Sequence, residues 1–326
     1  MEGSGKILRR SIHSFLQNYH YFTSTAAFLL LPFSASILLS QAPSPASSSL
    51  LPHIYSRLRT LFVAAGFPSS SQLFSTLNLK VSQTITSSIL TFPFSLTLLL
   101  VAKAFVIHAL NHNKPTFPPS FASIVSLYKP LLHTCIWNSL LIISAIATAF
   151  SLLSLTFSCF EGLGFSSPSS FLLLSAAGAV LFSVILANAL VIGNMAMVVS
   201  GMEERGGYMA ILKACILIRG RTSTGLFLAL PVNVILAAIE ALFQFRVVRA
   251  YHIAQRPGSS MVSEGILIAY LYSIFIVLDT IVSCMFYKSC KRESLIDPDD
   301  KHLLRIEFSE VENYGYMGTK NFEELP

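Results

Sequence analysis

The charged side chains inside long apolar stretches are the residues of this chain best placed to do chemistry. Lys103, Glu240 and Asp279 lie within runs that are otherwise almost uncharged. A charge in hydrocarbon is costly, so it usually faces a bundle interior or marks a functional path. One hypothesis is a clasp in which Lys103 and Asp279 lower each other's cost of burial. In the alternative, Lys103 reaches back to the membrane surface and Asp279 finds polar neighbours separately. Glu240 is expected to pair locally with Arg246 and Arg249.

Four asparagines extend this candidate polar cluster. They fall at similar depths in three of the apolar runs, at Asn138, Asn188, Asn194 and Asn233. Amides in a membrane bundle can bond across helices for roughly 0.6 to 2 kcal/mol. That structural account is favoured, while a small polar cavity is the alternative that would suit a transporter.

Other reactive residues offer weaker patterns. Cys284 and Cys290 flank the end of the last apolar run beside basic residues, a context for reversible acylation, although unmodified cysteine is the default. Tyr314 and Met317 match a four-residue sorting signal, with an inert tail as the alternative. The sequence contains no phosphate-binding loop, dinucleotide fingerprint, metalloprotease helix or nucleophile elbow. We therefore expect no enzyme activity, no cofactor and no metal.

Six long apolar runs must position these residues, and each can cross a hydrocarbon layer of roughly 30 Å as a helix. The runs are uniformly apolar and lack the two-residue alternation of a membrane barrel. The sequence therefore predicts an all-α integral membrane bundle. The predicted spans are Phe22–Ser40, Ile85–Leu110, Leu131–Phe157, Ser170–Ser200, Ser223–Phe245 and Gly265–Tyr287.

The net charge of +6 follows the predicted topology. Lys and Arg gather on alternate sides of the spans, which predicts that both termini are cytoplasmic. No basic face on a soluble domain indicates nucleic-acid binding. The chain then divides into a cytoplasmic N-terminal segment (1–21), a six-span membrane domain (22–292) and an acidic cytoplasmic tail (293–326).

Two connections are expected to form short helices at the membrane surface. The first carries Ile54, Leu58, Leu61 and Phe62 at helical spacing, and loop 202–221 carries a stripe of Tyr208, Ile211, Leu212 and Cys215. Packing on the membrane is favoured over a helix that binds a protein partner.

A pattern in the centre of the chain resembles plant multi-pass membrane proteins of unassigned function. It runs from Asn194 to Met202 and continues through Glu203, Gly207, Ala210, Lys213, Ala214, Leu217, Arg219, Gly220 and Arg221. The resemblance covers residues 194–221 and the six-span layout, and it implies an endomembrane or plasma-membrane location without catalytic residues.

The leading functional hypothesis is a non-enzymatic membrane organiser or trafficking adaptor. Its partners would be the lipid bilayer and a cytoplasmic protein that binds loop 202–221 or tail 293–326. The alternative is a small-solute or lipid transporter with a polar cavity in the cytoplasmic half of the bundle. A membrane-embedded lipid enzyme is the third hypothesis, disfavoured because no constellation of acid, base and metal ligands is present.

Overall fold

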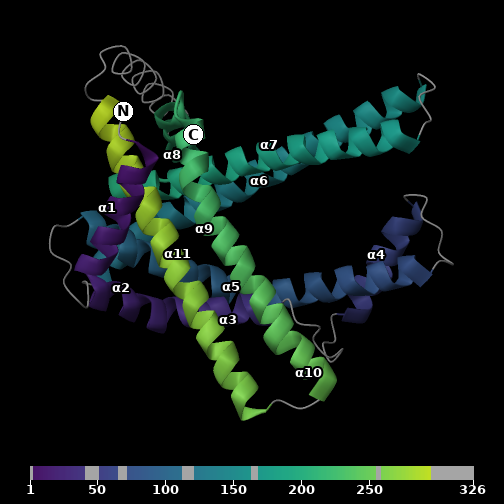
Figure 1. Cartoon of the computed structure of the whole chain (residues 1–326), viewed down its shortest axis with the longest axis horizontal. Helices are drawn as coiled ribbons and strands as arrows, with labels where there is room; N and C mark the ends of the chain where they lie inside the picture. The colour runs from purple at the N-terminus through teal and green to yellow at the C-terminus, as the bar shows by residue number, and fades with distance from the viewer. Residues whose placement is uncertain are drawn as a thin grey trace, which may run out of the picture. The chain divides into compact units, whose positions relative to one another are not determined.

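The computed structural model describes residues 3–40, 51–64, 72–111, 121–162, 168–254 and 258–294, and within these ranges it contains helices and no strands. The predicted all-α architecture is thereby confirmed (Figure 1). The elements are α1 (Ser4–Gln17), α2 (Tyr19–Thr25), the π-helical turn η1 (Ala26–Leu30), α3 (Leu31–Ser40), α4 (Leu51–Ala64), α5 (Gln72–Asn111), α6 (Phe121–Gly162), α7 (Pro168–Glu203), α8 (Tyr208–Ile218), α9 (Thr222–Phe243), the π-helical turn η2 (Gln244–Val248), α10 (Arg249–Ala254) and α11 (Ser259–Ser294).

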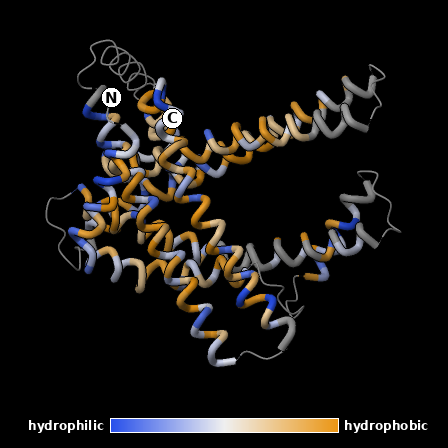
Figure 2. The backbone as a smooth tube through the Cα atoms, viewed as in Figure 1, coloured by the Kyte–Doolittle hydropathy of each residue, from blue (hydrophilic) through white to orange (hydrophobic). Residues whose placement is uncertain are grey.

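Six helical segments of the described residues are long and apolar enough to cross a membrane, so the chain is a multi-pass membrane protein. Hydrophobic residues follow one another along these segments in Figure 2. The helices extend beyond the predicted spans, since α5 begins at Gln72 and α6 at Phe121. Helical bonding continues into polar flanks because the backbone groups there still gain internal partners. The segments are Tyr19–Ser40, Pro93–Asn111, Ser123–Leu153, Ala176–Glu203, Thr222–Tyr251 and Ser259–Arg292.

The chain divides into two compact units. Unit 1 holds the described residues of Met1–Ser14, Val125–Leu230 and Thr280–Pro326, and unit 2 holds those of Phe15–Ile124 and Pro231–Asp279. Helices α9 and α11 contribute residues to both units. The predicted polar residues are therefore shared between two separately packed bodies.

Unit 2 is held together by a buried apolar core and by single hydrogen bonds between helices. The Tyr21 hydroxyl donates to the carbonyl of Phe105 at 3.2 Å and thereby joins α2 to α5. The hydroxyls of Ser34 and Ser273 lie 2.9 Å apart and join α3 to α11. Such bonds satisfy polar groups where no water is available. The fully buried core side chains include Phe22, Leu30, Leu38, Leu100, Ile107 and Val277.

A π-helical turn in the first span accommodates a proline. The N–H of Leu31 bonds to the carbonyl of Ala26, which widens the helix by one residue. Pro32 follows at once and has no N–H to offer. Such turns are the usual way in which a helix absorbs an interruption of its hydrogen bonds.

In unit 1, α6 and α7 form a long helical hairpin, and the two ribbons run side by side in Figure 1. Glycine permits the close approach, because a Cβ on Gly193 would lie 2.0 Å from the amide oxygen of Asn138. A Cβ on Gly178 would likewise meet Leu153 at 2.3 Å. Few residues of this hairpin are buried. The buried share is 6% in the apolar segment Ser123–Leu153 of α6 and 17% in the apolar segment Ala176–Glu203 of α7. Most of its surface is thus available to lipid.

The two short helices predicted between the spans are present as α4 and α8. Helix α4 packs on α5, where the Asn78 amide donates to the carbonyl of Tyr55 at 3.3 Å. The predicted stripe on α8 was wrong in one member. Ile211 is 8% exposed and faces the protein, whereas Tyr208, Leu212 and Cys215 point outward.

Candidate functional site

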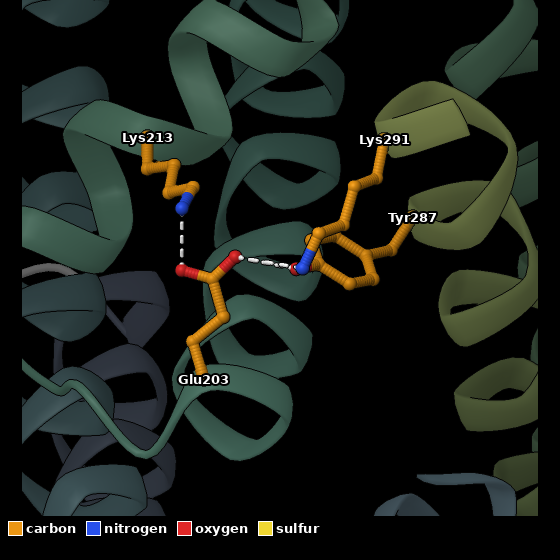
Figure 3. Close-up of polar contacts among 4 residues, drawn as sticks. All are labelled: Glu203, Lys213, Tyr287 and Lys291. Atoms are coloured by element: carbon orange, nitrogen blue, oxygen red, sulfur yellow. Dashed lines mark hydrogen bonds and ion pairs between the residues drawn. The ribbon is translucent and has the colours of Figure 1, made fainter. Parts of the chain in front are cut away.

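A carboxylate at the end of α7 gathers partners from three elements. Glu203 accepts a hydrogen bond from the Lys213 ammonium of α8 at 2.5 Å and one from the Tyr287 hydroxyl of α11 at 2.6 Å. The Lys291 ammonium lies 3.6 Å from the same carboxylate oxygen that accepts from Tyr287. Figure 3 shows Glu203 between Lys213 on one side and the α11 pair on the other. We call these four residues the Glu203 cluster.

The local sequence explains why these side chains meet. Helix α7 ends at Glu203, and the chain reverses through Glu204 and Gly207, whose φ angles are 56° and 87°. Positive φ is natural for glycine and strained for glutamate. The reversal lets α8 pack back on α7 and brings Lys213 to Glu203. Tyr287 and Lys291 are four residues apart on α11, so they share one face.

The reversing turn is also fixed to α6. The N–H of Gly207 donates to the hydroxyl oxygen of Thr134 at 2.8 Å, and that hydroxyl donates to the carbonyl of Pro130. A Cβ on Gly206 would lie 2.4 Å from the same carbonyl. Glycine is therefore required where the turn touches the α6 backbone. The turn is held by α6 at one point and by the Glu203 cluster at another.

The Glu203 cluster places one carboxylate between two lysine ammonium groups. The Glu203 side chain is 15% exposed and Lys213 is 21% exposed, while Lys291 is 52% exposed. Charged donors at 2.5 to 3.6 Å favour the ionised form of this half-buried carboxylate. Lys291 also donates to the Tyr287 hydroxyl at 3.2 Å and lies over its ring. Within the described residues, no group of His, Cys, Asp and Glu could hold a metal ion.

The structure places Lys103 and Asp279 in unit 2, on α5 and α11. Both are half-buried, and Lys103 acts electrostatically on the Asp279 carboxyl. Among the described residues no ion pair or hydrogen bond joins them. Charge compensation between Lys103 and Asp279 therefore stays a prediction.

The four asparagines are divided between the two units. Asn138, Asn188 and Asn194 belong to unit 1, and Asn233 belongs to unit 2. Asn188 donates to the carbonyl of Val184 in its own helix, so it makes a local bond rather than a bond across helices. The amide oxygen of Asn138 is buried against Gly193 without a hydrogen-bond partner.

Three further predictions concern Glu240, the two cysteines near the end of α11 and the sorting signal of the tail. Glu240 accepts a hydrogen bond from the Tyr272 hydroxyl at 2.8 Å, so its partner is on α11 and not the nearby arginines. Arg249 instead lies over the Phe245 ring. Cys284 and Cys290 are buried, so their acylation would require a change in packing near the C-terminal end of α11 that exposes the two thiols. Tyr314 and Met317, like the rest of tail 295–326, lie outside the described residues.

The Glu203 cluster was missed as a site at the sequence level. Glu203 appeared only as one position of the central pattern, because an acid after an apolar run looks like an ordinary helix end. One signal was available. Between Glu2 and Glu203 the chain has a single acidic residue, Glu161, so an acid near a span was already unusual.

Comparison with known proteins identifies a family without assigning an activity. A family model described as a domain of unknown function (DUF8558) matches residues 2–306. No curated protein and no solved structure matches the chain. The matched region contains all six spans and the Glu203 cluster. The chain therefore belongs to the DUF8558 family.

Proposed function

We propose that this protein is a non-enzymatic membrane organiser or trafficking adaptor that presents loop 202–221 as a fixed contact surface. The observation that carries the proposal is the double attachment of this loop. Glu203 binds Lys213 within the loop and Tyr287 of α11, and Thr134 ties the loop to α6. A connection of this length needs neither attachment merely to join two helices. A loop whose conformation is already fixed is suited to recognition, because it loses less conformational entropy when a partner binds.

The proposal places this surface and tail 293–326 on the cytoplasmic side. The basic residues at the ends of spans four and six support that orientation through the positive-inside rule. The membrane domain then acts as the anchor, and the loop and tail are the parts that meet partners.

The test compares the neighbours of the protein in cells, by crosslinking and quantitative mass spectrometry of the full-length chain. Glu203→Ala should lose most neighbours that crosslink to loop 202–221. Glu264→Ala is the matched control, because Glu264 is an exposed glutamate of α11. Neighbours that are equally abundant in wild type and Glu203→Ala would contradict the proposal.

A second candidate function, transport of a small solute or lipid, rests on Lys103 and Asp279. Both are ionisable residues inside membrane-spanning segments, and such residues often mark the path of a solute. Flux into reconstituted liposomes would be measured for wild type, Lys103→Ala and Asp279→Asn. Flux that both substitutions abolish would favour transport over the organiser proposal.

A further inference from the structure

We propose that the outward face of α8 lies in the headgroup layer of the membrane and binds anionic phospholipid. This inference rests on the proposed function and names the partner of loop 202–221. The face consists of Tyr208, Leu212 and Cys215, which recur at intervals of four and three residues and so share one side of the helix.

Helix α8 has two apolar sides, and the protein covers only one. Ala214 is fully buried and Leu217 is 7% exposed, because this side packs on unit 1. On the other side Tyr208 is 47% exposed and Leu212 is 48% exposed. Eleven residues span about 16 Å as a helix, about half of the hydrocarbon thickness. The helix is therefore too short to cross the membrane and suits a position in its surface.

The outward face of α8 is continuous with the lipid-facing side of a span. The ring of Tyr208 contacts the ring of Trp137 on α6, with centroids 6.0 Å apart in an edge arrangement. From Trp137 the exposed apolar surface continues along α6 through Leu140 and Ile143. A surface that joins a membrane span without a break is covered by the same lipid as the span.

The Trp137–Tyr208 pair has the chemistry of a membrane border. The Trp137 indole N–H donates to the His133 ring nitrogen at 3.2 Å, so its polar end points along α6 away from Leu140. Trp and Tyr concentrate where hydrocarbon gives way to headgroups, because their rings are apolar and their ends are polar. The pair thus suits the depth at which α6 leaves the hydrocarbon, so that part of the apolar segment Ser123–Leu153 lies outside it.

Exposed basic residues flank α8 along the chain and occur on α6. Arg205 precedes α8 and Arg219 follows it, and both side chains are exposed. Lys129 is exposed on α6 two turns beyond Trp137. One exposed acid, Glu204, lies in the same turn, and Glu203 is engaged by its cluster. This excess of cations favours an anionic lipid surface, with each cation strengthening partitioning about fivefold.

The depth of α8 can be measured with the full-length protein in lipid nanodiscs. Trp137 is the single tryptophan of the chain, so its emission reports one place. A polarity-sensitive fluorophore on Cys215 reports the other, in a Cys135→Ser and Cys159→Ser background, since Cys284 and Cys290 are buried. The nanodiscs contain phosphatidylcholine alone or phosphatidylcholine with phosphatidylserine. The quenchers are lipids brominated near the headgroup, lipids brominated at the chain end, and acrylamide in the water.

We expect both reporters to be quenched most by lipid brominated near the headgroup. Phosphatidylserine should draw the Cys215 reporter further from acrylamide, and Arg219→Gln should weaken that lipid dependence about fivefold. Arg9→Gln is the matched control, because Arg9 is an exposed arginine of α1. Leu212→Asp should expose the Cys215 reporter to acrylamide while the Trp137 emission stays unchanged.

Two results would overturn the inference. In one, acrylamide reaches the Cys215 reporter equally in both lipid mixtures and brominated lipid does not quench it. In the other, only a crosslinked protein neighbour shields the reporter, which would make the face a protein-binding surface. That second result would leave the organiser proposal intact, whereas unchanged crosslinked neighbours in Glu203→Ala would contradict the organiser proposal alone.

Discussion

Two acid–lysine pairs, one in each unit, behave differently. In unit 1 the Glu203 carboxylate is 2.5 Å from Lys213 and also accepts from Tyr287. In unit 2, no hydrogen bond or ion pair joins Asp279 to Lys103 among the described residues. The first arrangement fixes the elements that carry it, because each bond is short and directional. The second fixes nothing by contact. Charge pairing therefore fixes the turn between α7 and α8, whereas no such contact joins Lys103 to Asp279 among the described residues.

The largest expected effect on stability comes from removing the Glu203 carboxylate. Glu203→Ala leaves two ammonium groups beside each other and a tyrosine hydroxyl without its acceptor. We expect the protein to lose about 3 kcal/mol of stability. Thermal unfolding in detergent, followed by circular dichroism, measures the loss. Glu264→Ala should change stability by less than about 0.5 kcal/mol, as surface substitutions usually do. Equal losses of stability in Glu203→Ala and Glu264→Ala would mean that the Glu203 cluster does not stabilise the packing of α7, α8 and α11.

The turn offers a second way to weaken the same attachment. Gly207→Ala places a Cβ 2.6 Å from His133 at a φ of 87°, so we expect a loss of about 2 kcal/mol. Gly220 has a φ of 78° with nothing within 4 Å of its Cβ position. Gly220→Ala therefore measures the backbone cost alone, about 1 kcal/mol. If the two alanines cost the same in chemical unfolding, contact with α6 does not hold the turn.

A single hydroxyl tests the link between Glu203 and α11. Tyr287→Phe removes the 2.6 Å hydrogen bond and keeps the ring beneath Lys291. Because Lys213 still engages the carboxylate, we expect a loss of only about 1 kcal/mol. A double-mutant cycle with Glu203→Gln would show the coupling, and a coupling of zero would remove α11 from the Glu203 cluster.

The smallest effect is expected in unit 2. Asp279→Asn keeps the shape of the side chain and breaks no hydrogen bond among the described residues. We expect stability to change by less than about 1 kcal/mol, since the substitution removes no hydrogen bond or ion pair of the described residues. Unfolding in the same detergent provides the comparison with Glu203→Ala. A loss as large as that of Glu203→Ala would show that the two pairs do the same structural work.

The fold followed from the sequence because hydrocarbon thickness sets a length that apolar runs either reach or do not. The spans were predicted for this reason, and the helices α4 and α8 were predicted from apolar residues at helical spacing. The inner face of α8 was predicted less well. Ile211 and Leu212 are equally apolar neighbours, and only the packing on α7 decides which of them is buried.

The site was harder to predict because its bonds join residues through the fold. Glu203 and Lys213 meet only after a turn with two positive φ angles, and Tyr287 arrives from a distant helix. Glu240 was assigned to nearby arginines by proximity in sequence, whereas Tyr272 reaches it across the packed helices α9 and α11. Single-sequence patterns report local spacing, and these partners are set by tertiary contacts.

The central claim is that the Glu203 cluster holds α8 against the ends of α7 and α11. Hydrogen–deuterium exchange of the backbone amides of 208–218, in nanodiscs, tests it most directly for wild type and Glu203→Gln. The account predicts slow exchange in wild type and exchange about tenfold or more faster in the variant, with unit 2 unchanged. Equal exchange of these amides in both proteins would contradict it.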